Sequence, residues 1–479
     1  PIVLLQIADL ANIALVRHLL QARAHSRLKG LVVDLVIWTE DQSGYRQQLH
    51  DEIMGLIAAG VEANVLDRPG GIFVRHSDHI SLEDRLLLQS VARIIIVDSR
   101  GTLSEQLKLR RAPEARIPEL RAVTTRPPVV RAATVSPRAD LILTNEIGGF
   151  TRDGREYVVT LARGRATPAP WVNVLANAQF GTVVSENGGG YTWSENAHEF
   201  RVTPWHNDPV TDESGEAFYL RDEETGRFWS PTPLPAPGGG AYVSRHGFGY
   251  SVFEHDTAGI FSEMTVYVAT DAPVKFSVLK VRNDSGQARR LSATGYVEWV
   301  LGDLRPKCAM HVTTEVDPAT GAIFARNPFN SEFPDRVAFF DVDEASRTVT
   351  GDRGEFVGRN GSLQQPAAMT RARLSGKVGA ALDPCAAIQV GFELAPGQER
   401  QFVFRMGVGG SRDEARAHVA RFRGAAAART ALESVWDYWK RTLGAVQVET
   451  PDESINVLAN GWLVYQTLAC RFWARSGYY

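Results

Sequence analysis

The sequence predicts a multidomain α+β protein, with an α/β segment first, a large antiparallel β-sandwich in the middle and helices at the end. Residues 1–110 alternate between helical and strand patterns, whereas residues 139–410 hold many short alternating runs bounded by turn residues. Helix-start signals recur after Gly409 and Gly410. A chain of 479 residues is long enough for several such domains.

Residues 1–110 are predicted to form the α/β segment. The predicted helices cover about residues 9–28, 44–60 and a stretch from Ser81, and the predicted strands cover 31–38, about 63–66 and 92–99. Helical periodicity, closing glycines and runs of branched apolar residues support these assignments. No GxGxxG or GxxxxGKS/T motif follows either buried strand, so the segment is interpreted as a packing layer without a nucleotide site.

Residues 111–138 are predicted to be an extended linker. Their five prolines prevent a helix, and arginines outnumber the acidic residues. A polyanion-binding arm is the alternative function of such a segment, but prolines and arginines in a linker usually keep it stiff and soluble.

Residues 139–410 are predicted to form the sandwich. The runs REYVVTLA, VKFSVLKVRN and RQFVFRMGVG alternate apolar and polar positions, and clusters such as NDSGQ and DPATG separate the runs. So many strands favour a large antiparallel sandwich over a small barrel.

Residues 411–449 are predicted to be a helical linker. Ser411 and Glu414 have the spacing of a capping box, and Gly424 is expected to break the helix that follows. A second helix is expected to bury Leu432, Val435, Trp436 and Trp439 and to stop at Gly444, before a short strand at 445–450. Thr450 as N-cap and Pro451 at the first helical position then predict a helix through residues 450–479.

Composition excludes several classes of protein. The formal net charge of −3 gives no basic field, so no nucleic-acid partner is expected. Three widely spaced cysteines without a CxxC pair fit a reducing compartment and predict no metal site. His198, His206 and Asp208 match no metal-binding spacing, and no cofactor is predicted. No apolar run reaches the roughly 18 residues of a membrane span.

Residues 188–209, GGGYTWSENAHEFRVTPWHNDP, are predicted to be a surface loop that binds carbohydrate. Aromatic faces stack on pyranose rings, and planar polar groups bind hydroxyls. The candidate substrate-binding residues of this stretch are Tyr191, Trp193, Arg201, Trp205, Asn207 and Asp208. The alternative is that the two tryptophans only pack and that Asp208 only begins a turn.

Neighbouring acids offer a hydrolase as another alternative. Glu195 with Glu199, or Asp222 with Glu223 and Glu224, could supply the acid and base of a glycosidase. However, RDEETGRFW has the pattern of a hairpin with its acids in the turn, so these acids are interpreted as solvated. No nucleophile pattern is present in the sequence.

Several long motifs, in order, resemble one enzyme family. TPAPWVNVLANAQFG, the stretch 188–209 and YVSRHGFGYSVF look like the N-terminal sandwich of family-94 glycoside phosphorylases. Within that family the similarity is greatest to the cyclic β-1,2-glucan synthases, whose phosphorylase module is preceded by a stretch that resembles residues 1–110. The resemblance covers nearly the whole chain.

The resemblance implies that an (α/α)6 barrel follows the sandwich and holds the active site. Residues 450–479 would be the start of this barrel, truncated, with Asn460, Trp462, Tyr465 and Gln466 opening it. Its helix is expected to present an exposed apolar face to the rest of the barrel, made by Leu458, Trp462, Tyr465 and Phe472. The catalytic acid and the phosphate-binding residues are expected beyond Tyr479, so no catalytic residue is assigned. Because the chain begins at Pro1 and ends within a helical pattern, it is expected to be an internal fragment that is inactive alone.

The resemblance also implies substrates, partners and a location. Arg245 and His246 of SRHGFGY are expected to contact sugar or a second subunit, and a core histidine with satisfied hydrogen bonds is the alternative for His246. The expected partners are a β-glucan or oligosaccharide, inorganic phosphate in the intact module only, the rest of the barrel and a second copy of the chain. The parent would sit on the cytoplasmic side of the bacterial inner membrane, with this fragment soluble. The alternative is a non-catalytic carbohydrate-binding or dimerisation module.

Overall fold

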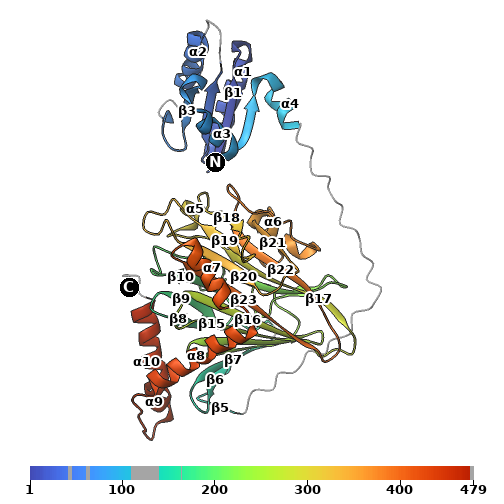
Figure 1. Cartoon of the computed structure of the whole chain (residues 1–479), viewed down its shortest axis with the longest axis vertical. Helices are drawn as coiled ribbons and strands as arrows, with labels where there is room; N and C mark the ends of the chain where they lie inside the picture. Colours follow the sequence, from blue (N-terminus) through green and yellow to red (C-terminus); the bar gives the residue numbers. More distant parts are fainter. Residues whose placement is uncertain (41–45, 61–64, 109–139, 163, 475–479) are drawn as a thin grey trace. The chain divides into compact units, whose positions relative to one another are not determined.

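The chain forms two compact units, Pro1–Ala122 and Val123–Tyr479, in a computed structural model (Figure 1). The structure describes residues 1–40, 46–60, 65–108, 140–162 and 164–474. The predicted linker 111–138 lies outside these residues. Within the described ranges, every helix is too short or too polar to cross a membrane.

The first unit is a parallel sheet of four strands in the order β3-β2-β1-β4. Its elements are β1 (Ile2–Ile7), α1 (Ile13–Leu28), β2 (Asp34–Thr39), α2 (Arg46–Ala58), β3 (Ile72–His76), α3 (Leu82–Val91), β4 (Ala92–Val97) and α4 (Leu103–Lys108). Buried residues of β1, β2 and β4 pack with those of α1 and α2 in one apolar cluster. The predicted α/β character is present.

Two elements of this unit differ from the prediction. Ile2–Ile7 forms β1, a central strand, although no strand was predicted there. Its apolar run passes into α1 with only a short turn at Leu10–Asn12, so the run resembled part of the helix. β3 follows the DRPGG turn and pairs with β2, although no strand was predicted there. The strand expected near 63–66 lies partly outside the described residues.

At the carboxyl ends of β1 and β4 lies the carboxylate of Asp98. It accepts hydrogen bonds from the backbone N–H groups of Ala8 (2.8 Å) and Asp9 (3.0 Å). Dinucleotide-binding folds place a phosphate on such N–H groups after the first strand. Here the Asp98 side chain bonds these N–H groups, and the absence of a nucleotide site stays a prediction.

The second unit is a layered antiparallel sandwich. Its largest sheet has eleven strands in the order β18-β19-β20-β23-β16-β15-β14-β13-β7-β6-β5, and a sheet of five has the order β12-β11-β17-β22-β21. A third sheet has the order β10-β9-β8. The strands are β5 (Leu141–Ile142), β6 (Gly148–Thr151), β7 (Glu156–Leu161), β8 (Val172–Ala176), β9 (Phe180–Ser185), β10 (Gly190–Ser194), β11 (Glu216–Asp222), β12 (Phe228–Trp229), β13 (Tyr242–Gly247), β14 (Tyr250–Thr257), β15 (Ile260–Val268), β16 (Val274–Asn283), β17 (Arg289–Glu298), β18 (Thr313–Val316), β19 (Ile323–Arg326), β20 (Val337–Val342), β21 (Arg347–Asp352), β22 (Pro384–Leu394) and β23 (Glu399–Gly409).

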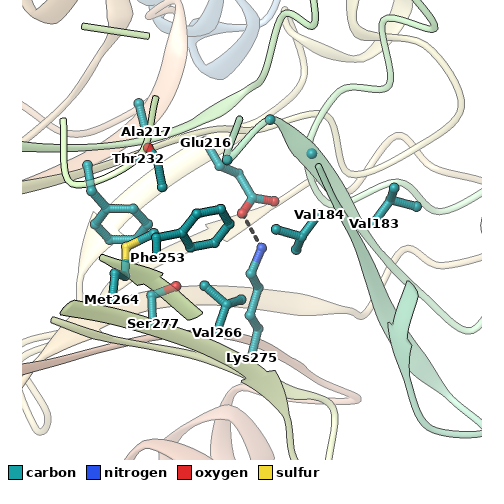
Figure 2. A pocket seen from close by; sticks show the side chains of 14 residues that line it. Val183, Val184, Glu216, Ala217, Thr232, Phe253, Met264, Val266, Lys275 and Ser277 are labelled. Carbon is teal, nitrogen blue, oxygen red and sulfur yellow. Dashed lines mark hydrogen bonds and ion pairs between the residues drawn. The ribbon is translucent and has the colours of Figure 1, made fainter. Parts of the chain in front are cut away.

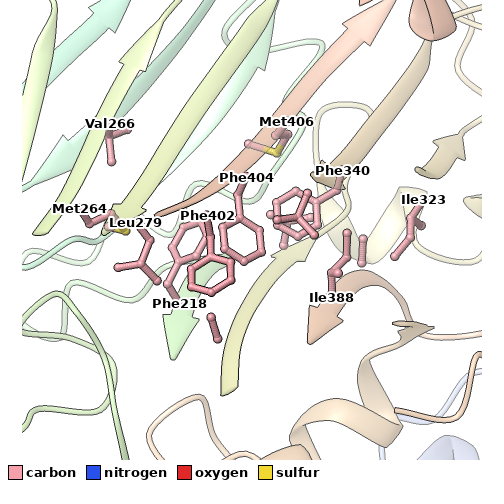
Figure 3. Close-up of a cluster of buried hydrophobic side chains, with 14 of the residues drawn as sticks. Phe218, Met264, Val266, Leu279, Ile323, Phe340, Ile388, Phe402, Phe404 and Met406 are labelled. Atoms are coloured by element: carbon pink, nitrogen blue, oxygen red, sulfur yellow. The ribbon is translucent and has the colours of Figure 1, made fainter. Parts of the chain in front are cut away.

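The main core lies between the eleven-stranded and the five-stranded sheets (Figure 3). Phe404 of β23 meets Phe218 of β11 edge-on, with ring centroids 5.3 Å apart. Met264 and Leu279 belong to the same cluster, as does Ile388. The runs that predicted this sandwich coincide with β7, β16 and β23, and the last two of these strands are buried on both faces.

Two helices cover the outer face of the large sheet. These are α7 (Arg412–Arg421) and α8 (Ala425–Leu443), separated at Gly424, whose φ is +95°. The Ser411 side chain accepts from the Glu414 N–H at 3.2 Å, as the predicted capping box requires. The fully buried Arg405 of β23 donates to Asp341 at 2.6 Å and to the carbonyl of Phe422. It therefore links the sheet to the turn between α7 and α8.

The C-terminal residues form a continuous helical stretch. It consists of α9 (Glu453–Val457), a π-helical segment (Leu458–Trp462), α10 (Leu463–Gln466) and a second π-helical segment (Thr467–Trp473). Two short helices complete the second unit, α5 (Arg305–Cys308) and α6 (Arg353–Val357).

Three expectations for the C-terminal part are wrong. The N-cap is Asp452, whose carboxylate accepts from the Ser454 N–H at 2.9 Å, and not Thr450. Residues 445–450 form no strand, since they find no partner strand among the described residues. Trp436 is 46% exposed rather than buried.

Candidate functional site

The stretch 188–209 is not a solvated loop. It contributes β10, which pairs with β9, and a following loop that is buried at residues 200 and 202–204 and exposed at 205–207. Trp193 and Phe200 are each only 1% exposed. The prediction missed this burial because the stretch is too short and too polar to show an apolar period.

An aromatic cluster nevertheless reaches the surface from this stretch. The ring of Tyr191 lies 4.7 Å from that of Trp205 and 5.5 Å from that of Trp193. Trp205 is 40% exposed, and Arg201, four residues before it, donates to the Asp303 carbonyl at 3.1 Å. An exposed indole backed by a second ring is suited to stack on the apolar face of a pyranose.

The two polar residues at the end of the stretch have different environments. The Asp208 carboxylate accepts from the Val210 N–H (2.9 Å) and the Thr211 hydroxyl (2.6 Å), and these hydrogen bonds lower its pKa. It therefore holds a turn, as the alternative interpretation predicted. Asn207 is exposed with φ of +50°.

Arg245 lies in an ion-pair network on the outer face of the large sheet. Its guanidinium contacts Glu156 at 3.0 Å and Glu254 at 2.9 Å, and the Tyr250 hydroxyl donates to Glu156 at 2.7 Å. With 21% of its side chain exposed, Arg245 joins β7, β13 and β14. The predicted contact of this residue with sugar stays a prediction.

His246 is a buried structural residue. Its Nε2 donates to the Trp171 carbonyl at 3.1 Å, which leaves Nδ1 to accept from the Ser251 hydroxyl at 2.9 Å. Burial lowers its pKa to about 4, so the imidazole is neutral at physiological pH. Both nitrogens are used within the sandwich, and the structure does not present them to a sugar.

The tip of the β13–β14 hairpin binds the C-terminal helical stretch. The ring of Phe248 lies 4.8 Å from that of Trp462 and 5.4 Å from that of Tyr465. The indole N–H of Trp462 donates to the Gly154 carbonyl at 2.8 Å. We call this contact, made by Phe248 and Gly249 with Trp462 and Tyr465, the helix socket.

The Tyr465 hydroxyl is the polar centre of the helix socket. It accepts from the Gly249 N–H at 3.1 Å, and the Asn173 Oδ1 lies 2.8 Å away as an acceptor for its proton. Tyr465 is 2% exposed and Trp462 is 8% exposed. The expectation that both side chains would lie open towards a barrel is therefore wrong, because the sandwich itself buries them.

The other two residues expected to open a barrel are peripheral. The amide of Asn460 bonds both backbone groups of Val448, at 2.6 and 2.8 Å, and so ties the loop 445–450 to the helix. Gln466 is exposed.

The acidic pairs do not form a glycosidase dyad. The hairpin at 222–228 is confirmed by the pairing of Arg221 with Phe228. Asp222, however, is 3% exposed and paired with Arg289, so it is not the solvated turn acid that was expected. Glu195 is paired with Arg336, and Glu199 lies 2.6 Å from His198. Glu223 pairs with Arg221 at 3.1 Å, whereas Glu224 is exposed in the turn, as expected.

Comparison with known proteins decides the family. The family description "Glycosyl hydrolase 94, supersandwich domain" matches residues 155–425, more than half of the chain. The description "Glycosyl hydrolase 94 superfamily, catalytic domain" matches residues 438–479. The chain belongs to glycoside hydrolase family 94.

Named relatives of this family-94 chain include a synthase and phosphorylases. It is 35% identical over 494 residues to the cyclic β-(1,2)-glucan synthase NdvB of Rhizobium meliloti, in an alignment that takes in 100% of this chain and 17% of that protein. It is 30% identical over 340 residues to the N,N′-diacetylchitobiose phosphorylase of Vibrio furnissii, which covers 68% of this chain and 41% of that enzyme. The chain thus spans well under half the length of either relative.

The family-94 sandwich also contains a small, partly open cavity of about 20 Å³, close to the volume that one water needs (Figure 2). Beside it the Lys275 ammonium lies 2.5 Å from the Glu216 carboxylate, which also accepts from the Thr192 and Thr203 hydroxyls. This buried network joins three sheets. The cavity beside it is far too small for a sugar. In the part of the chain that the structure describes, no cluster of His, Cys, Asp and Glu could hold a metal.

Proposed function

We propose that this chain is the supersandwich of a glycoside phosphorylase module of the cyclic β-1,2-glucan synthase type, joined to the first helix of its (α/α)6 barrel. The observation that carries the proposal is the helix socket. The segment that matches the family's catalytic domain begins at residue 438, and its Trp462 and Tyr465 are buried against the sandwich. The sandwich would thus fix where the barrel begins.

The outward side of the same helical stretch supports this role. Leu458, Leu463 and Phe472 are 43%, 55% and 61% exposed, although their neighbours Trp462 and Tyr465 are buried. A helix with one apolar side docked and another apolar side exposed is suited to lie between two layers. In this proposal the second layer is the rest of the barrel.

The proposed reaction is an inverting phosphorolysis of β-1,2-glucan. Inorganic phosphate attacks the anomeric carbon while a carboxylic acid protonates the leaving oxygen, which gives α-glucose 1-phosphate. The acid and the phosphate site belong to the proposed barrel beyond Tyr479, so this chain positions and does not catalyse. The parent would be membrane-bound, with this module on the cytoplasmic side.

The proposal is tested by release of α-glucose 1-phosphate from β-1,2-gluco-oligosaccharides and phosphate. A polypeptide that continues beyond Tyr479 is expected to release it, and the chain alone is not. In the longer polypeptide, Tyr465→Phe leaves the Gly249 N–H and Asn173 without their shared partner, a cost of about 1–3 kcal/mol. We expect it to lower kcat/KM about tenfold.

Tyr157→Phe is the matched control, because its hydroxyl bonds Asn145 near the surface, at 2.9 Å. It should leave kcat/KM within about twofold. Product from the chain alone, or equal effects of the two variants, would contradict the proposal.

A second candidate function is carbohydrate binding without catalysis, with dimerisation as its variant. The exposed face of Trp205, backed by Tyr191, is the observation that favours it. The two functions are compatible, since a sandwich that holds a barrel helix can also hold a glucan chain.

A further inference from the structure

An open groove of about 410 Å³ lies at the end of β10, next to the start of α7. Its volume falls within the roughly 300–1,000 Å³ of small-molecule sites. Its polar lining is Gln179, Glu195, Arg336 and Glu414, and Pro273 and Val408 add apolar surface. None of these residues was singled out as a binding residue from the sequence.

The groove holds charged groups whose charges are largely balanced. The Arg336 guanidinium is paired with Glu195, and the two side chains are 30% and 37% exposed. Glu414 accepts from the Gly410 N–H at 2.8 Å and remains half exposed. A guanidinium, carboxylates and the Gln179 amide thus offer both donors and acceptors to one ligand.

Glu195 has an uncommon backbone conformation in this groove. Its φ is +61°, a left-handed value that costs a residue with a side chain about 1–2 kcal/mol. Its N–H donates to the Gln179 carbonyl at 2.5 Å and its side chain pairs with Arg336, so two contacts maintain the conformation. Strained residues held in this way are frequent at ligand-binding sites.

We propose that this groove binds a neutral saccharide, as a subsite for one or two glucose units. One guanidinium against two carboxylates disfavours an anion, and two separately engaged carboxylates do not form a cation site. Sugar hydroxyls both donate and accept, so they match this mixture of groups. The choice of glucose rests on the proposed function, whereas the site itself does not.

The position of the groove relates it to the aromatic cluster. Residues 191 and 195 are four apart in sequence, with Tyr191 inside β10 and Glu195 one residue past its end. At about 3.3 Å per residue they are about 13 Å apart. A short glucan could therefore reach from Trp205 and Tyr191 towards Arg336.

The test is calorimetric titration of the whole chain with a β-1,2-linked glucose disaccharide, with inorganic phosphate as a second probe. Saturable binding of the disaccharide is expected, and Arg336→Gln should weaken it at least tenfold. Arg400→Gln is the matched control, because this arginine is also paired with a glutamate and is 37% exposed, outside the groove. It should change the affinity less than twofold.

A thermal unfolding scan of each variant distinguishes a loss of binding from a loss of folding. Arg336→Gln is expected to stay folded. Absence of disaccharide binding by the folded chain would overturn the proposal, as would equal affinities of the two variants. Phosphate binding that Arg336→Gln abolishes, without disaccharide binding, would make the groove an anion site and also overturn it. None of these outcomes depends on phosphorolysis, so the titration tests the groove separately from the proposed function.

Discussion

The stretches 188–209 and 244–250 combine the same kinds of residue, yet the fold uses them in opposite ways. Both place glycines beside aromatic rings, arginine and histidine. In the second stretch, Phe248 and Gly249 form part of the helix socket, and His246 is buried at 5% exposure. In the first stretch, Trp205 packs against Tyr191 and remains 40% exposed. Composition suggests a site in both, but only a side chain that the fold leaves uncovered can meet a ligand.

The largest effect is expected from Gly249→Ala in the helix socket. Gly249 has φ of +83°, and a Cβ there would lie 2.4 Å from the Trp439 Nε1 and 2.6 Å from Val435. Left-handed strain and overpacking together cost about 3–5 kcal/mol. Hydrogen exchange of residues 453–473 should show faster opening of the helical stretch.

Gly226→Ala is the control for this variant. Gly226 has φ of +70°, but a Cβ there would meet nothing within 4 Å. It should cost only the strain of about 1–2 kcal/mol and should not alter exchange in 453–473. If both alanines act alike, backbone strain rather than the socket explains the effect.

An intermediate effect is expected from acid acting on His246. Its folded pKa of about 4 lies below the unfolded value of about 6.5, so the unfolded chain binds more protons between these limits. Stability from this group is complete above about pH 6.5 and falls as the pH decreases. From pH 7 to 5 the loss is about 2 kcal/mol, at about 1.4 kcal/mol per pKa unit.

Urea unfolding of the sandwich at a series of pH values measures this loss. His246→Gln should flatten the profile in part, because His255 is also buried with a pKa of about 4 and keeps its share. An unchanged slope in the variant would show that the acid sensitivity arises elsewhere.

The smallest effect on stability is expected from Trp205→Ala, at under about 1 kcal/mol, because the side chain is partly exposed. Its effect on binding should be larger. If the aromatic cluster holds glucan, the affinity for β-1,2-gluco-oligosaccharides falls about tenfold, which is about 1.4 kcal/mol. Trp436→Ala, at 46% exposure on α8, is the control and should leave the affinity unchanged.

The sequence predicted the strands of the sandwich well and the fate of single side chains poorly. Runs such as VKFSVLKVRN coincide with β16, because a run of branched and aromatic residues bounded by turn residues is a local feature of a strand. The capping box at Ser411 and the break at Gly424 are also local and are confirmed. β1 was missed, since a short apolar run beside a helix has no period of its own.

Burial of the candidate site residues could not be read from local patterns. His246 is neutral because it is buried, and the carbonyl that accepts its Nε2 proton belongs to Trp171, 75 residues away. Trp462 and Tyr465 were expected to face outward, but they meet Gly154 and Asn173 across some 300 residues of sequence. The groove at Arg336 is assembled from β10, β23 and α7, so no single sequence motif predicts it.

The hydrogen bond between Tyr465 and Asn173 also has a consequence for the order of folding. The two residues are 292 positions apart, which makes this one of the most non-local contacts of the chain. On a ribosome that extends the chain from its N-terminus, Asn173 and the hairpin of Gly249 emerge long before Tyr465. The sandwich can therefore complete its sheets with the receiving surface still vacant, and docking of the C-terminal helix becomes a late step of synthesis.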